Sequence, residues 1–117
     1  KIDSPVYSNI TNITQGNGNI YLTGINNMVQ ATFNDLIGTT SNNSITLPIN
    51  TIPANYIPTS DMYMPIRVVL NNVGQLGLCK ILTDGSVEIY ASISGGNFGS
   101  SANSGFPAFT VNWTYPY

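Results

Sequence analysis

Hydrophobic and polar residues alternate in short runs along the chain, and turn-forming residues separate the runs. The alternation has the period of two that places every second side chain on the same face of a β-strand. It is clearest in the second half, where it predicts strands over residues 62–70, 75–82, 87–93 and 109–115. The residues that share a face in these four runs are, in order, Met62, Met64, Ile66, Val68 and Leu70; Leu76, Leu78 and Leu82; Val87, Ile89, Ala91 and Ile93; and Phe109, Val111, Trp113 and Tyr115.

The first half has a weaker pattern. Candidate strands cover residues 6–13, 19–23, 28–35 and 44–47, and turns are expected at 24–27, 71–74 and 83–86 because Asn and Gly tolerate positive φ. Residues 38–43 and 94–108 are expected to be loops. Four prolines between Pro48 and Pro65 indicate an extended crossover, since proline removes a donor from a ladder. About eight short strands predict an all-β fold: an antiparallel, jelly-roll-like β-sandwich that forms a single domain over residues 1–117.

Charged residues are scarce in this sequence, and their scarcity excludes several functions. Charged residues make up 7% of the 117 residues, with three Lys or Arg against five Asp or Glu. Three cations cannot neutralise a row of phosphates, so no nucleic-acid partner is expected. The apolar runs are far shorter than the roughly 18 residues of a spanning helix, so no membrane insertion is expected. Asn, Ser and Thr supply 16, 11 and 12 residues, which predicts a surface wetted by amides and hydroxyls.

Catalytic and metal-binding patterns are missing. The chain has no His and one Cys, which removes the commonest general base and excludes an internal disulfide. The five acidic residues show neither calcium-loop spacing nor a recognisable pair for glycoside hydrolysis. Cys79 and Lys80 are neighbours in a strand and point to opposite faces, so Cys79 is expected to be a buried hydrophobe. We therefore expect no enzyme, no metal and no cofactor; a hydrolase is a remote alternative.

Two surfaces are candidates for binding. The long 94–107 loop, with the 38–43 loop and the 71–74 turn, offers amides that suit sugar hydroxyls, and its aromatic rings either offer an apolar face or pin the loop to the sandwich. The receptor-binding candidates are Asn97, Phe98, Asn103, Phe106, Asn42 and Asn72. Strands with large groups on both faces indicate an oligomer subunit. The candidates for a trimer interface are Tyr63, Tyr90, Trp113 and Tyr115.

An ordered set of short segments resembles the C-terminal head domains of phage and virophage tail or capsid fibres. The segments are Leu47-Pro48, Tyr56-Ile57-Pro58, Met62-Tyr63-Met64-Pro65-Ile66, the run from Ile81 to Tyr90 with its Asp84-Gly85 turn, and the run from Phe109 to Tyr115. The resemblance spans residues 47–115. Ile57 stands where the family usually has Arg, so no role of that Arg is carried over.

This resemblance implies a trimeric, jelly-roll-like knob at the tip of a virion-surface fibre, forming the C-terminal part of a longer chain. Such heads attach the virion to a host-surface receptor, often a glycan. Two alternatives remain. A carbohydrate-binding or lectin-like module of a secreted protein would be a monomer or a dimer. A purely structural virion component would not bind host cells.

Overall fold

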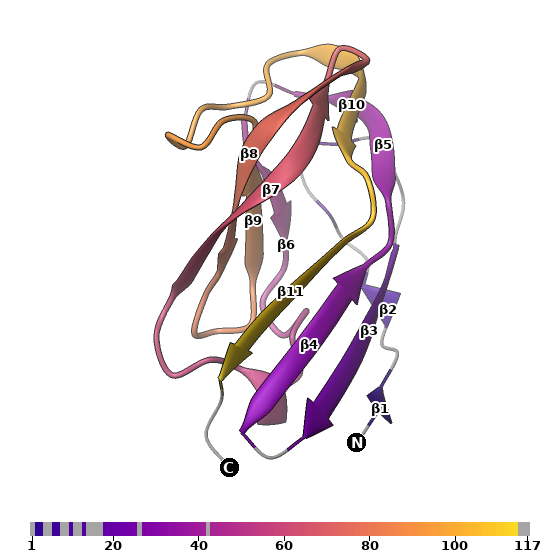
Figure 1. Cartoon of the computed structure of the whole chain (residues 1–117). Coiled ribbons are helices and arrows are strands. Elements are labelled where there is room, and N and C mark those ends of the chain that lie inside the picture. Colours follow the sequence, from indigo (N-terminus) through magenta and orange to yellow (C-terminus); the bar gives the residue numbers. More distant parts are fainter. Residues whose placement is uncertain are drawn as a thin grey trace.

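The computed structural model describes residues 2–3, 6–7, 10, 13, 18–25, 27–41 and 43–114, which form two antiparallel sheets stacked as a sandwich (Figure 1). One sheet has the order β1-β3-β4-β11, with β2 also paired to β3, and the other has the order β5-β10-β7-β8-β9-β6. The strands are β1 (Ile2–Asp3), β2 (Val6–Tyr7), β3 (Gly18–Ile25), β4 (Met28–Phe33), β5 (Leu36–Thr40), β6 (Ile45–Leu47), β7 (Met62–Leu70), β8 (Val73–Ile81), β9 (Val87–Tyr90), β10 (Ser101–Phe106) and β11 (Phe109–Thr114). A 3-10 helix, η1 (Ala54–Tyr56), lies in the crossover from β6 to β7.

The strand pairing is nested. Strand β7 pairs with β8, β6 with β9, β5 with β10 and β4 with β11, every time antiparallel. This is the pairing of one long hairpin that is bent and rolled, which is how a jelly roll closes its two sheets around a core. The predicted all-β, antiparallel, jelly-roll-like sandwich is therefore confirmed. The expected strand number, about eight, was too low, because the described residues form eleven strands.

The core lies between the two sheets and is built from alternate residues of the strands. In β4, for example, Val29, Ala31 and Phe33 are all fully buried, while Met28 and Gln30 face outward. Removing one such Ile, Leu or Phe side chain from water contributes about 1.5–3 kcal/mol. The face predicted for residues 62–70 is confirmed, with Ile66 and Val68 buried. The Phe109, Val111 and Trp113 face is also confirmed; Tyr115 lies outside the described residues.

The prediction of which face of β8 is buried was wrong. The inward residues are Gly77, Cys79 and Ile81, whereas Leu76 is 57% exposed. Gly77 fixes this register, because a Cβ built there would lie 2.5 Å from the carbonyl oxygen of Tyr90 and 2.6 Å from the Val68 side chain. Strand β9 is likewise shorter than predicted and ends at Tyr90. The backbone then turns, with the Ala91 amide donating to the Gly96 carbonyl at 2.8 Å, and Ile93 is 49% exposed.

Two segments expected as loops contain strands. Residues 38–43 overlap β5, and residues 94–108 contain β10. These two strands pair with each other, and neither has the alternation of a half-buried strand, which is why the pattern did not reveal them. Strands β3, β4 and β6 lie where they were expected. The predicted strand over residues 6–13 is seen only as β2 and as a single bridge from Ile13 to Thr40, and its other residues lie outside the described part.

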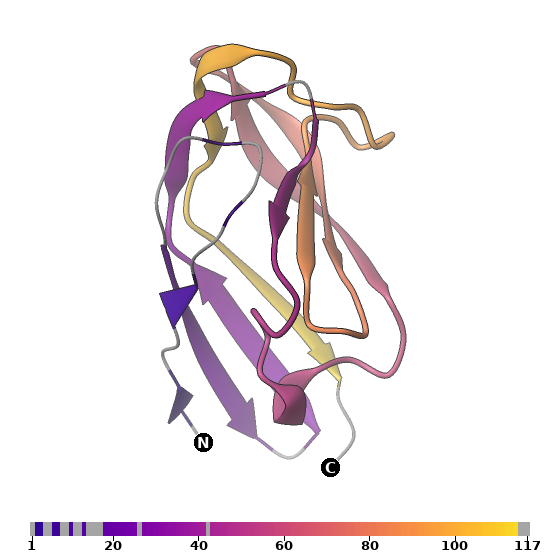
Figure 2. The ribbon, with the colours of Figure 1, turned by 180° about the vertical axis from the view of Figure 1, so that it is seen from behind.

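The crossover that follows β6 has the irregular structure that its prolines predict. Residues 48–61 form no strand and contain η1. The crossover is at the opposite end of the sandwich from the loop that follows β9 (Figure 2). Among the described residues, no helix has the length and apolar character needed to cross a membrane.

Candidate functional site

Three segments expected to form a binding surface do meet at one end of the sandwich, at the top of Figure 1. The Phe98 amide donates to the Asn43 carbonyl at 3.1 Å, which joins the loop after β9 to the residues that follow β5. The Asn72 amide donates to the Asn103 carbonyl at 3.0 Å, which joins the β7–β8 turn to β10. We call residues 71–74 and 97–103, together with Asn43, the apical surface.

The apical surface displays asparagine side chains on an unusual backbone. Asn71, Asn72 and Asn103 have φ values of 51°, 68° and 52°, in the left-handed region that Asn tolerates better than most residues. The Asn71 amide donates to Ser104 Oγ at 2.9 Å, which ties the turn to β10. Asn72, Asn97 and Asn103 are all exposed. Of the receptor-binding candidates, these three are exposed in the segments of the apical surface, and Asn42 lies outside the described residues.

The two aromatic candidates of the same group are buried and cannot offer a face to a ligand. Phe98 is 2% exposed and Phe106 is fully buried. The Phe106 ring meets Phe109 edge-to-face, with centroids 5.3 Å apart. Phe98 therefore anchors the apical surface to the core, and Phe106 anchors the far end of β10, which is the pinning role considered as the alternative. Sequence alone does not tell an inward aromatic from an outward one in a segment without periodicity.

A second surface covers the outer face of β7, β8 and β9. Tyr63 lies directly opposite Lys80, and Lys80 lies directly opposite Glu88. The Lys80 ammonium is 5.2 Å from the centre of the Tyr63 ring and 4.8 Å from that of Tyr90, so two aromatic rings hold the cation. The Tyr90 hydroxyl donates to Glu88 Oε1 at 2.7 Å. Partial burial of Tyr90, followed by this hydrogen bond and the Glu88 charge, raises the Tyr90 pKa, and the nearby Lys80 opposes the shift.

Apolar side chains continue this surface. Leu78 pairs with Pro65 on one side and Tyr90 on the other, and Leu76 pairs with Arg67. Leu76 and Tyr63 are 57% and 58% exposed. We call this set the tyrosine face; it consists of Tyr63, Pro65, Leu76, Leu78, Lys80 and Tyr90. The sequence placed Tyr63 and Tyr90 here but missed the two leucines, because the inward role of Gly77 is invisible without the register.

The remaining interface candidates do not join the tyrosine face. Trp113 is 2% exposed, and its Nε1 donates to the Tyr56 carbonyl oxygen at 2.7 Å, so its expected place in a subunit interface is wrong. An inward position in β11 explains this burial, since Val111 and Trp113 share the core face. Tyr115 lies outside the described residues.

The one cysteine is chemically shielded. Cys79 is fully buried, and burial raises the pKa of its thiol to about 12. The structure thus agrees with its expected role as a small core residue. Within the described part of the chain, no three His, Cys, Asp or Glu side chains gather in a group that could hold a metal ion.

Comparison with known proteins shows a likeness of fold to a solved structure. No protein-family model matches the sequence, and characterised proteins give no match. Among solved structures, the chain is similar to the crystal structure of the reovirus attachment protein sigma1 in complex with alpha-2,3-sialyllactose, with a TM-score of 0.59 and 14% sequence identity. The superposition covers 97% of this chain and 66% of that one, so this chain spans just under two thirds of its length. The fold of this protein is therefore one that a viral attachment protein also has.

Proposed function

We propose that this protein is the receptor-binding head of a viral attachment fibre displayed at the virion surface. It attaches the virion to a receptor on the host surface, and the receptor that we propose is a glycan. The observation that carries the proposal is the shared fold over 97% of the chain with an attachment protein that was solved with a bound saccharide. The sequence resemblance to fibre heads of phages and virophages points the same way and covers residues 47–115.

The apical surface supports the attachment role chemically. It presents exposed amides at Asn72, Asn97 and Asn103, and an amide both donates and accepts hydrogen bonds, as a sugar hydroxyl does. Phe98 is buried beneath it, and its backbone amide bonds the Asn43 carbonyl, so this part of the surface is anchored to the core. A surface of this kind contains few charges, so its contacts should depend only weakly on salt.

We further propose that three copies of the chain bury the tyrosine face between them. Its exposed Tyr63 and Leu76 form an apolar region of the kind that marks interaction sites. Three basic and five acidic residues give each copy a net charge of −2, so electrostatic repulsion between copies is small. Because the tyrosine face is on the side of the strands and not at their apical end, assembly leaves three apical surfaces free. Three weak contacts between these surfaces and receptors then combine into a stronger overall attachment through avidity.

Solution mass tests the assembly. Light scattering after size exclusion should give about three times the 12.5 kDa of one chain. Leu76→Asp should give the single-chain mass, because it places a charge in the buried face. Ile49→Asp is the matched control: Ile49 is 62% exposed but lies in the crossover, so the assembly should persist. A wild-type monomer, or an intact assembly of the Leu76→Asp variant, would contradict the trimer.

Attachment tests the receptor-binding role. A fluorescent form of the protein should bind host cells and glycans on an array. The double variant Asn72→Gly, Asn97→Ala should lose this binding at unchanged melting temperature; Gly is chosen at position 72 because φ is 68° there. Asn55→Ala, an exposed change in η1 at the opposite end, should bind normally. Absence of any binding by the wild type would favour a structural virion component, and a glycan-binding monomer would favour a lectin-like module.

A further inference from the structure

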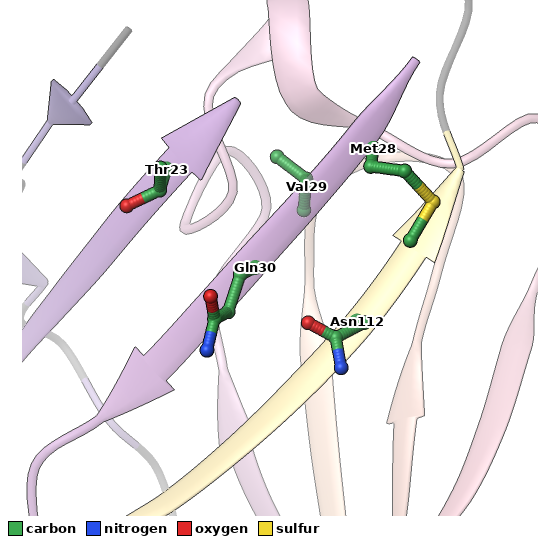
Figure 3. A pocket seen from close by; sticks show the side chains of 5 residues that line it. All are labelled: Thr23, Met28, Val29, Gln30 and Asn112. Carbon is green, nitrogen blue, oxygen red and sulfur yellow. The ribbon is translucent and has the colours of Figure 1, made fainter. Parts of the chain in front are cut away.

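A row of polar side chains crosses the outer face of the five-stranded sheet, away from both surfaces described above. Thr23 in β3 lies directly opposite Gln30 in β4, and Gln30 lies directly opposite Asn112 in β11. Figure 3 shows these side chains around a shallow hollow that Met28 and Val29 complete. Neighbouring strands lie about 4.8 Å apart, so the register alone sets Thr23 and Asn112 one strand spacing from Gln30, on either side of it.

The two amides in this row are free to bind a ligand. Gln30 and Asn112 are exposed, and neither side chain has a hydrogen-bond partner among the residues that the structure describes. Each amide supplies an NH₂ donor and a carbonyl acceptor. Two such groups on adjacent strands match a pair of neighbouring hydroxyls, each of which donates one hydrogen bond and accepts another.

Apolar groups flank the row along the strands. Met28 is 49% exposed on one side of Gln30, and Tyr21 is 48% exposed on the far side of Thr23. In the neighbouring cross-strand row, Tyr21 lies opposite Thr32, and Thr32 lies opposite Thr110. The hydroxyls of Thr32 and Thr110 bond each other at 2.9 Å, so they are less available to a ligand than the two amides. The row therefore combines unpaired amides with nearby thioether and aromatic surface, the combination that suits the mixed polar and C–H faces of a pyranose ring.

Electrostatics narrow the class of sugar. Strands β3, β4 and β11 contain no charged residue at all. A carboxylated sugar would find no cation in this row to offset the loss of its hydration, whereas an uncharged sugar needs none. The hollow has a volume of about 180 Å³, below the roughly 300–1,000 Å³ of pockets that enclose a drug-sized ligand, so it accommodates one sugar unit and leaves the rest in solvent.

We infer that the row of Thr23, Gln30 and Asn112 is a binding site for an uncharged saccharide, distinct from the apical surface. The inference rests on the proposed attachment function and adds a ligand class to it. In the proposed trimer this sheet face is on the other side of the sandwich from the tyrosine face and stays accessible.

Nuclear magnetic resonance observes this site directly, through the side-chain NH₂ signals of Gln30 and Asn112. The ¹⁵N-labelled protein is titrated with the methyl glycosides of glucose, galactose, mannose and N-acetylglucosamine, with lactose, and with α-2,3-sialyllactose. We expect at least one uncharged sugar to shift both signals, and sialyllactose to bind no more tightly than lactose. The double variant Gln30→Ala, Asn112→Ala should weaken binding at least tenfold without changing the melting temperature, and Asn55→Ala should bind as the wild type does.

The possible outcomes separate this inference from the proposed function. Shifts confined to the amides of Asn72, Asn97 and Asn103 would overturn the row as a site and leave the attachment role in place. Tighter binding of sialyllactose than of lactose at Gln30 would overturn the uncharged class. If none of the six sugars moves the Gln30 and Asn112 signals, the inference fails, and host-cell attachment then decides the proposed function independently.

Discussion

The indole nitrogen of Trp113 donates a 2.7 Å hydrogen bond to the carbonyl oxygen of Tyr56. This contact ties the edge strand β11 of one sheet to η1, in the crossover that joins two strands of the other sheet, β6 and β7. Both side chains are almost fully buried. The crossover contains no strand, and this bond and the packing around it help to hold η1 against the sandwich.

Trp113→Phe should lower the free energy of unfolding by about 0.5–1.5 kcal/mol for the hydrogen bond alone, because it removes the indole donor that bonds the Tyr56 carbonyl oxygen. Urea unfolding at one fixed protein concentration measures the change. Asn112→Ala, a neighbouring exposed substitution, should stay within about 0.5 kcal/mol of the wild type. If the Trp113 indole proton of the wild type exchanges with solvent as fast as that of free tryptophan, the bond does not persist in solution.

Gly105→Ala should be among the most damaging single substitutions in β10. The Gly105 φ of 142° is unfavourable for other residues, and an added Cβ would lie 1.9 Å from the Leu36 carbonyl oxygen. Strain of this kind costs about 1–3 kcal/mol, and the clash with β5 adds to it. Gly95→Ala is the matched control, since φ is 90° there but no atom lies within 4 Å of the added Cβ. Equal losses of stability in the two variants would contradict the close approach of β5 and β10.

Cys79 should not react with iodoacetamide in the native protein at pH 8. Burial denies the reagent access and holds the thiol pKa at about 12, so the thiolate is scarce at this pH. Mass spectrometry should show no adduct on the native protein and one adduct in denaturant. Rapid labelling under native conditions would mean that β8 opens readily.

The turn before β9 should make stability depend on acid pH. Asp84 Oδ1 accepts hydrogen bonds from the Ser86 hydroxyl at 2.6 Å and the Ser86 amide at 2.9 Å, and these bonds lower the pKa of Asp84 below its ordinary value of 3.8. A carboxyl whose pKa is lower in the folded state stabilises the protein above pH 3.8, and this contribution is lost as the pH falls through the folded pKa.

Ser86→Ala removes the hydroxyl donor and should raise the Asp84 pKa toward 3.8, as followed by the carboxyl ¹³C shift during a pH titration. Ser60→Ala removes an exposed hydroxyl outside this turn and should leave the Asp84 pKa unchanged. An Asp84 pKa that does not respond to Ser86→Ala would assign the shift to the backbone donors alone.

The strands that could be predicted from the sequence are those with one face buried in the core and the other face in water. Strands β7 and β9 are recognisable in the sequence because their buried residues alternate with more exposed ones. The buried residues are Ile66 and Val68 in β7, and Val87 and Ile89 in β9. Strands β5 and β10 do not, since their structure comes from pairing with each other. In β10, for example, Ser104 and Gly105 are buried next to Phe106, so burial runs along consecutive residues.

The candidate sites were predictable only as far as exposure could be inferred. Asn72 lies in a turn, Asn97 lies in irregular backbone, and Asn103 lies where the register of β10 shifts. All three are polar and follow no strand pattern, so their exposure was foreseeable. The orientation of Phe98 and Trp113 was not, because both inward and outward positions suit a single aromatic residue next to small polar ones. The Thr23, Gln30 and Asn112 row depends on cross-strand register between segments far apart in the chain, which no local pattern reveals.

The nested strand pairing also determines when the five-stranded sheet can be completed during synthesis on the ribosome. Strand β4 is synthesised roughly 80 residues before its neighbour β11, a delay on the order of ten seconds at ordinary translation rates. Until Phe109–Thr114 has emerged, β4 presents an unpaired edge of the kind that promotes aggregation. Translation that stalls before this point leaves the five-stranded sheet incomplete. The nascent chain therefore most needs chaperone protection between the synthesis of β4 and that of β11.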